Sequence, residues 1–89
     1  MLQRVIPAHD GKHKYIAVFS NGVHTPFGAV GYEDFTMHKD EKRRRRYVER
    51  HEKDLDTKNP YRAGYLSMYI LWNKPTIEAS IKDYNDRFF

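Results

Sequence analysis

The sequence predicts a small α+β fold, in which an antiparallel β-hairpin or three-stranded sheet is followed by three helices packed mainly on one of its faces. Three observations predict it: apolar residues alternate near the N-terminal end, an Asn-Gly pair follows them, and apolar residues recur at helical spacing farther along. The 89 residues contain no internal repeat or linker. We therefore expect one domain, 1–89, with its β part in residues 1–30 and its helical part in residues 36–89.

The clearest predicted strand covers residues 13–19. Its alternate residues Tyr15, Ala17 and Phe19 share one face, as the two-residue period of a strand requires. The run Arg4–Pro7 predicts a short first strand, which ends at the proline because proline has no amide hydrogen to donate.

Asn21 and Gly22 lie between that strand and a predicted return strand over residues 23–27. A type I′ turn needs positive φ at both central residues, and the Asn-Gly pair tolerates this conformation best. Such a turn would place Phe19 opposite His24. The first part of the chain therefore predicts a tight hairpin.

The centre of the chain predicts a basic helix that begins between Thr36 and Asp40, because either side chain can accept hydrogen bonds from the first amides of a helix. The apolar stripe of this helix is confined to its second half and consists of Tyr47, Val48, His51 and Leu55. We therefore expect only the second half to be firmly docked, with the first half facing solvent or a partner.

Two further helices are predicted after Asn59. Asn59 and Pro60 combine an N-cap residue with a proline at the first helical position, and the helix should run to about Trp72 as the most buried element. Thr76 should cap the last helix. The apolar residues of that helix recur at i, i+4, i+7 and i+11, namely Ile77, Ile81, Tyr84 and Phe88.

Composition limits the classes of function and location. The chain has no cysteine, so we expect neither disulfides nor thiolate metal sites, and a setting inside a cell or virion fits better than secretion. No apolar run approaches the roughly 20 residues of a membrane span, and the first residues lack the apolar region of a signal peptide. The net charge of +4 favours acidic partners.

The strongest functional signal is a basic run, made of Lys42, Arg43, Arg44, Arg45, Arg46, Arg50 and Lys53. Successive helical residues point about 100° apart, so at most two or three of these arginines can bind one surface. From Lys39 to Asp54 there are eight basic and five acidic residues, a local net charge of +3. The run therefore predicts contact with a mixed-charge protein, with the phosphates of DNA or RNA, or with a nuclear import receptor.

Three aromatic residues are candidates for an interface or for base stacking: Tyr61, Tyr65 and Trp72. A tryptophan at the end of a helix, before a turn, is more often a core residue. In that case we expect Asn73 to bond to the local backbone.

No pattern typical of catalysis or of metal binding is present. Of the five histidines, only His9 and His13 are four residues apart, and they fall in a predicted turn and strand, not on a helix; none belongs to an HExxH sequence. Glu33 and Asp34, with His38, have the ingredients of an acid–base site, but turn and cap roles explain Asp34, Thr36 and Asp40 more simply. We therefore expect no enzymatic activity, no metal and no cofactor.

Several short motifs follow one another in order: Phe27-Gly28-Ala29, Gly31-Tyr32-Glu33-Asp34-Phe35-Thr36, His38-Lys39-Asp40 and Leu71-Trp72-Asn73-Lys74-Pro75. This series, FGA-x-GYEDFT-x-HKD followed by LWNKP, resembles a small family of proteins of unknown function that nucleocytoplasmic large DNA viruses encode. The resemblance covers nearly the whole chain from about His13. It implies a viral origin and a place in the virion or in its assembly, and it brings no catalytic residues with it.

Two functions are therefore expected. The first is that of a minor structural or assembly protein of a large DNA virus virion, which binds larger capsid proteins through the basic helix and the aromatic surface. The second is that of a viral nucleic-acid-binding module that uses the arginine-rich helix on phosphates. The interleaved acidic residues favour the first, because phosphate binding normally needs a broad basic face. With either function, we expect the protein in the virion or inside the infected host cell, in its cytoplasm or nucleus.

Overall fold

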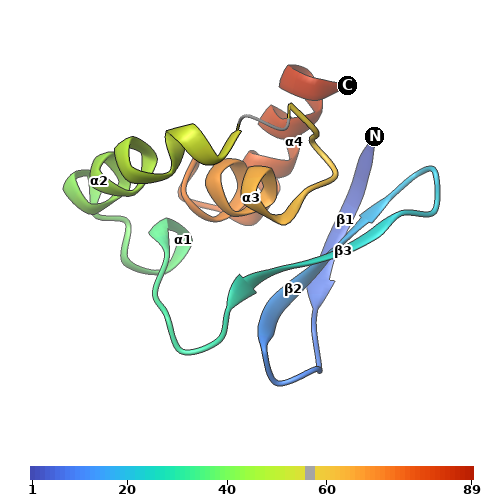
Figure 1. Cartoon of the computed structure of the whole chain (residues 1–89), viewed down its shortest axis with the longest axis horizontal. Coiled ribbons are helices and arrows are strands. Elements are labelled where there is room, and N and C mark those ends of the chain that lie inside the picture. The colour runs from blue at the N-terminus through green and yellow to red at the C-terminus, as the bar shows by residue number, and fades with distance from the viewer. Residues whose placement is uncertain (56–57) are drawn as a thin grey trace.

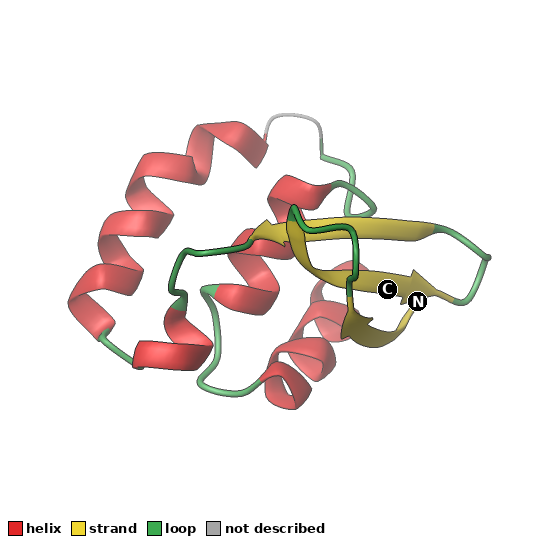
Figure 2. Ribbon diagram, turned by 90° about the horizontal axis from the view of Figure 1, so that it is seen from below, coloured by secondary structure: helices red, strands yellow, loops and turns green. Residues whose placement is uncertain are grey.

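The computed structural model describes residues 1–55 and 58–89. Its β part is an antiparallel sheet in the order β1 (Leu2–Pro7), β2 (His13–Phe19) and β3 (His24–Ala29). The helices gather on one side of this sheet, and α2 lies farthest from it (Figures 1 and 2). The predicted α+β class is confirmed, and of the two predicted β arrangements the chain forms the three-stranded sheet.

The helical part contains the segments α1 (Phe35–His38), α2 (Glu41–His51), α3 (Ala63–Leu66) and α4 (Ile77–Phe88). A 3₁₀ turn, Glu52–Leu55, follows α2, and a π-helical turn, Ser67–Leu71, continues α3. Over the residues that the structure describes, none of these helices has the length and apolar character needed to span a membrane.

The first strand begins two residues before the predicted one. A bulge between Leu2 and Arg4 places Leu2 opposite Phe19, where Leu2 is only 1% exposed. The side chain of Asn85, in α4, accepts a hydrogen bond from the Leu2 amide at 2.8 Å and donates one to its carbonyl at 2.9 Å. These two bonds tie the outer strand of the sheet to the last helix.

The turn between β2 and β3 is not the predicted type I′ turn. The Gly22 amide donates to the Phe19 carbonyl at 3.1 Å, and the Phe19 amide donates to the Val23 carbonyl at 2.9 Å. The loop therefore has three residues, and of residues 20–22 only Gly22 has positive φ, at 89°. Asn21 instead accepts a hydrogen bond from the Val23 amide at 3.1 Å.

This longer loop shifts the register of the hairpin by one residue. His24 lies opposite Val18 and not opposite Phe19, so the predicted pairing is wrong. The observed register places Phe27 opposite Tyr15, on the face of the sheet that the helices cover, and Phe27 is completely buried there. A slip of one residue would turn Phe27 to the other face, so burial of this ring decides the register.

Two aspartates cap the first helices, as predicted. The Asp34 carboxylate accepts a hydrogen bond from the Thr36 amide at 3.0 Å at the start of α1. The Asp40 carboxylate accepts from the amides of Lys42 and Arg43, at 3.0 and 3.3 Å, so α2 begins at the late end of the predicted range. The bond from the Arg43 amide is the main cause that lowers the pKa of Asp40.

The next helix begins later than predicted, at Ala63, and from Ser67 it continues as a π-helical turn. Asn59 caps a turn and not the helix, because its side chain accepts a hydrogen bond from the Tyr61 amide at 3.0 Å. The predicted start at Pro60 is therefore wrong, whereas the helical segment ends at Leu71, close to the predicted end at about Trp72.

Tertiary hydrogen bonds explain the late start. The carbonyl of Pro60 accepts a hydrogen bond from the Tyr84 hydroxyl, and the carbonyl of Tyr61 accepts one from the Thr25 hydroxyl at 2.8 Å. In a helix these carbonyls would instead accept amides from the following turn. Contacts with α4 and β3 therefore hold this segment out of the helix.

The core lies between the sheet and the last two helices. Its most deeply buried side chains are Leu2, Ala17, Phe19, Phe27, Leu66, Ile70, Leu71 and Tyr84. Burial raises the pKa of the Tyr84 hydroxyl. The predicted stripe of α4 is confirmed, because Tyr84 is buried and Ile77, Ile81 and Phe88 pack against the core.

Candidate functional site

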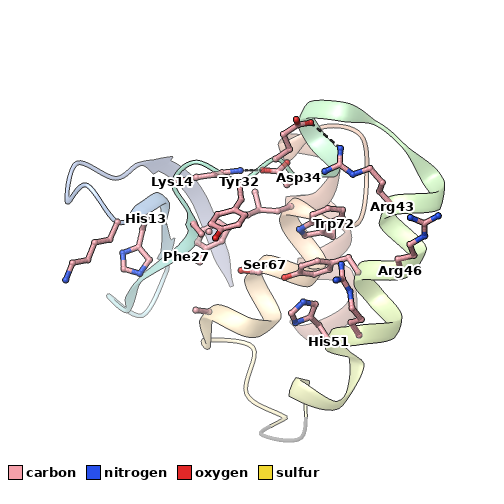
Figure 3. A pocket seen from close by; sticks show the side chains of 18 residues that line it. His13, Lys14, Phe27, Tyr32, Asp34, Arg43, Arg46, His51, Ser67 and Trp72 are labelled. Atoms are coloured by element: carbon pink, nitrogen blue, oxygen red, sulfur yellow. Dashed lines mark hydrogen bonds and ion pairs between the residues drawn. The ribbon is translucent and has the colours of Figure 1, made fainter.

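An open cleft of about 720 Å³ separates the sheet from α2. Its lining comes from residues 12–14 at the start of β2, the end of β3, the segment 32–34, α2, and residues of the segment 63–72 that includes the π-helical turn. Figure 3 shows Lys14 and Tyr32 on the sheet side of the cleft, and Arg43 and Arg46 on the α2 side. Segments far apart in the sequence therefore meet around one hollow.

The α2 helix turns one stripe of the basic run toward the cleft. Arg43, Arg46 and Arg50 line it at positions i, i+3 and i+7, together with Tyr47 and His51. At about 100° per residue, these five side chains fall within an arc of about 140° around the helix axis. The structure therefore brings three of the predicted contact residues together on one side of the helix.

The other predicted contact residues lie outside the lining of the cleft. Lys42, Arg45 and Lys53 are exposed to solvent. Arg44 turns the other way, because its Nε donates to the Asn73 carbonyl at 2.9 Å. The expectation that only the second half of α2 is docked is therefore wrong: Arg44 anchors the first half.

Asn73 connects this anchor to α4. Its side-chain amide donates to the Asp83 carboxylate at 2.6 Å, and the Arg87 Nε donates to the same carboxylate oxygen at 2.6 Å. Burial acts to raise the pKa of Asp83, but these hydrogen bonds outweigh it and leave that pKa below its ordinary value. The predicted bond from Asn73 to the local backbone is wrong, because α4 brings a carboxylate within its reach.

Both carboxylates of the cleft pair with cations that also line it. Lys14 Nζ lies 2.7 Å from the Asp34 carboxylate, and Arg43 Nη1 lies 3.3 Å from the Glu33 carboxylate. The first pair is nearly buried, whereas the second is about half exposed and is therefore weakened by solvent. Each carboxylate is thus partly neutralised by a cation of the same lining.

The acidic residues of α2 point away from the cleft. Measured around the axis from Arg43, Glu41 lies at about 160° and Glu49 at about 240°. Neither lines the cleft, and Glu41 instead lies 3.5 Å from Arg44. The cleft lining holds five Lys and Arg residues against two carboxylates, so folding separates charges that are interleaved in the sequence.

Three rings stack along the α2 side of the cleft. The ring centres of Tyr47 and Trp72 lie 4.2 Å apart with planes only 4° apart, and His51 stacks on Tyr47 at 4.1 Å. Tyr32, which is 73% exposed, stands on the sheet side. The cleft therefore combines cationic groups with aromatic faces.

Of the three predicted interface aromatics, Trp72 is the one that lines the cleft, where it is half-buried. Tyr65 is 7% exposed and lies in the core, where its hydroxyl donates to the Leu55 carbonyl at 2.7 Å. Tyr61 packs edge-on against Phe19, with ring centres 4.6 Å apart.

The histidines do not form a cluster with metal-binding geometry in residues 1–55 and 58–89, where no three His, Cys, Asp or Glu side chains are placed to hold an ion. One histidine instead contacts a nearby carboxylate: hydrogen bonds from the backbone and ring of His13 lower the pKa of Asp10. His38 Nδ1 accepts from the Asp40 amide at 2.9 Å.

Sequence reasoning missed the cations and the aromatic residue on the sheet side of the cleft: Lys12, Lys14 and Tyr32. No periodicity links them to α2, because the turn before β2, the sheet and the loop after β3 bring them there. In contrast, the helical period alone predicts that Arg43, Arg46 and Arg50 share one side of α2.

Residues 3–51 match the model of a family of unknown function, DUF5754. The match spans 49 of the 89 residues, and it contains every Lys and Arg of the cleft. Comparison with curated proteins gave no match, and neither did comparison with solved structures.

Proposed function

The chain belongs to the DUF5754 family, whose function is unknown, and we propose that it is a nucleic-acid-binding module that holds phosphates in its cleft. The separation of charge around α2 carries this proposal. Arg43, Arg46 and Arg50 line the cleft, while Glu41 and Glu49 lie away from it. The interleaved charges that favoured a protein partner in the sequence therefore do not face the same surface.

The remaining charges of the cleft support the same proposal. Glu33 and Asp34 already have cationic partners, whereas Lys12, Arg46 and Arg50 have no ion-pair partner within the described residues. Guanidinium groups bind phosphate oxygens through paired hydrogen bonds, and cations gathered in a concave site attract an anion more strongly than scattered ones. The proposal is one of binding and includes no catalytic step and no cofactor.

Titration of a labelled oligonucleotide with the purified protein tests the proposal. We expect micromolar or tighter binding at about 50 mM salt. If three phosphates are neutralised, the affinity should fall about 20-fold by about 200 mM, because counterion release makes binding to a single strand depend on salt with a slope of about −0.7 per phosphate. Absence of binding at the lower concentration would contradict the proposal.

Two adjacent arginines provide a matched pair of variants. Arg46→Gln removes a charge from the cleft, and Arg45→Gln removes the same charge about 100° away around the helix. We expect Arg46→Gln to weaken binding and to reduce the salt slope by about 0.7, the contribution of one phosphate of a single strand, and Arg45→Gln to change both little. Equal effects of the two variants would show that net charge, not the cleft, governs binding.

A second candidate is a minor structural or assembly protein of a large DNA virus virion that binds larger capsid proteins. One observation favours it: the side of α2 away from the cleft exposes charges of both signs, among them Lys42, Arg45 and Glu49. Such a surface suits a mixed-charge protein, and the resemblance to proteins of large DNA viruses supports a location in the virion or inside the infected cell.

Recovery of the protein from stripped virions tests this second candidate. Arg45→Glu should prevent its incorporation, and Arg46→Gln should leave incorporation intact. Of these two arginines, Arg46 lines the cleft and Arg45 lies on the outer side of α2. Incorporation that is insensitive to Arg45→Glu would count against this surface as the contact.

A further inference from the structure

We infer that the cleft takes single-stranded nucleic acid, with one unpaired base held inside it; this inference rests on the proposed function. The direction of the cations gives the first reason. A protein that reads a duplex inserts a helix or ribbon into a groove of the nucleic acid. Here Arg43, Arg46 and Arg50 line a hollow of the protein, so the ligand must enter the protein.

The dimensions of the hollow give the second reason. A volume of about 720 Å³ lies within the range of sites that enclose small organic ligands, and it exceeds what a phosphate group needs. A base with its sugar and phosphate is a ligand of this class. A paired base cannot reach the interior of the cleft without leaving its duplex.

The aromatic lining gives the third reason. Tyr32 is more exposed, at 73%, than any other large apolar or aromatic side chain of the described residues. It faces the cleft from the sheet side, opposite the side on which Trp72 and His51 lie (Figure 3). Rings of this kind stack on bases of any sequence, and single strands offer faces that a duplex hides.

The arrangement of the two kinds of side chain fits one nucleotide unit. Lys12 and Arg46 are exposed cations of the lining, one from the turn before β2 and the other from α2, so cations from two separate segments are available to the phosphates that flank a bound base. Leu71, which is 2% exposed, closes the cleft toward the core with an apolar surface. The base therefore packs between apolar groups while its phosphates remain among the cations.

Comparison of a single strand of about 12 nucleotides with the duplex of the same sequence tests the inference at low salt. We expect the single strand to bind about tenfold more tightly than the duplex. Tyr32→Ala should weaken single-strand binding about tenfold and leave duplex binding unchanged, because it removes one stacking face. Tyr32→Phe keeps the ring and should stay within about twofold of the unmodified protein.

The outcomes separate the inference from the function on which it rests. If neither nucleic acid binds, the proposed function is overturned. If both bind equally, or if Tyr32→Ala weakens both or neither, only the inference is overturned. Competition by AMP at the concentrations at which the strand itself competes would also overturn it, since the cleft would then select a free nucleotide. Thermal unfolding is the folding control, and we expect the Tyr32 variants to melt at the temperature of the unmodified protein because this side chain is so exposed.

Discussion

Two sides of α2 use the same amino acid for different purposes. On the inner side, the Arg44 side chain is 28% exposed, bonds to the Asn73 carbonyl and lies 5.7 Å from the ring centre of Phe35. On the cleft side, Arg43 is 45% exposed and Arg46 is solvent-accessible. Adjacent arginines thus differ in exposure and in contacts because about 100° of helical rotation separates them. The position of a residue on the helix, and not its type, therefore decides whether it anchors α2 or lines the cleft.

Trp72 lies where the two sides of α2 meet, and its removal should have the largest effect. Trp72→Ala removes the ring on which Tyr47 stacks and should lower the free energy of unfolding by about 3 kcal/mol, as measured in urea. Trp72→Phe keeps an aromatic face and should lower the free energy of unfolding by less. Unchanged stability in the alanine variant would show that Trp72 does not support either side.

Arg44 tests the inner side directly. Arg44→Ala leaves the Asn73 carbonyl without its charged donor and should lower the free energy of unfolding by about 2 kcal/mol. Arg45→Ala, next to it on the outer surface, should change stability by less than about 0.5 kcal/mol. Equal stability of both variants in urea would contradict the anchoring role of Arg44. A larger loss of nucleic-acid binding in Arg44→Ala than in Arg46→Gln would contradict the division of roles between the two sides of α2.

Asp83 makes the inner side sensitive to pH. Its pKa in the folded protein lies below the ordinary value of 3.8, so the stability that it contributes is present above that value and is lost as the pH falls through the folded pKa. Unfolding in urea at about pH 6 and about pH 2.5 should show that Asp83→Asn removes part of the acid-induced loss. Asp86→Asn, at an exposed site of the same helix, is the control. A steep loss that persists in Asp83→Asn would rule out this carboxylate as its source.

We expect the smallest effect, a change in nucleic-acid affinity, from replacing acidic residues. Glu33→Gln removes a negative charge from the cleft and should strengthen nucleic-acid binding about twofold to fivefold at low salt, whereas Glu49→Gln removes one from the far side of α2 and should have less effect. Fluorescence titration of both variants measures the difference. A larger gain from Glu49→Gln would mean that the charges on the two sides are not separated.

Local rules predicted the elements of this protein well. Asp34 and Asp40 cap helices because short acceptor side chains satisfy amides a few positions away, and the stripe of α4 faces the core because its period is helical. The errors occur where distant groups compete with local ones. Burial of Phe27 shifts the hairpin register, and hydroxyl groups of Tyr84 and Thr25 delay the start of α3.

The sequence by itself therefore determined the α+β class, the caps at Asp34 and Asp40 and the stripe of arginines that a helix must place on one side. Only the tertiary structure decided what that stripe faces. It placed Lys14 of the sheet and Tyr32 of the loop after it on the side of the cleft opposite α2, and it turned Arg44 inward onto Asn73. The physical reason is range: caps and helical periods depend on neighbours a few residues away, whereas a cleft depends on how separate segments pack once the core is formed.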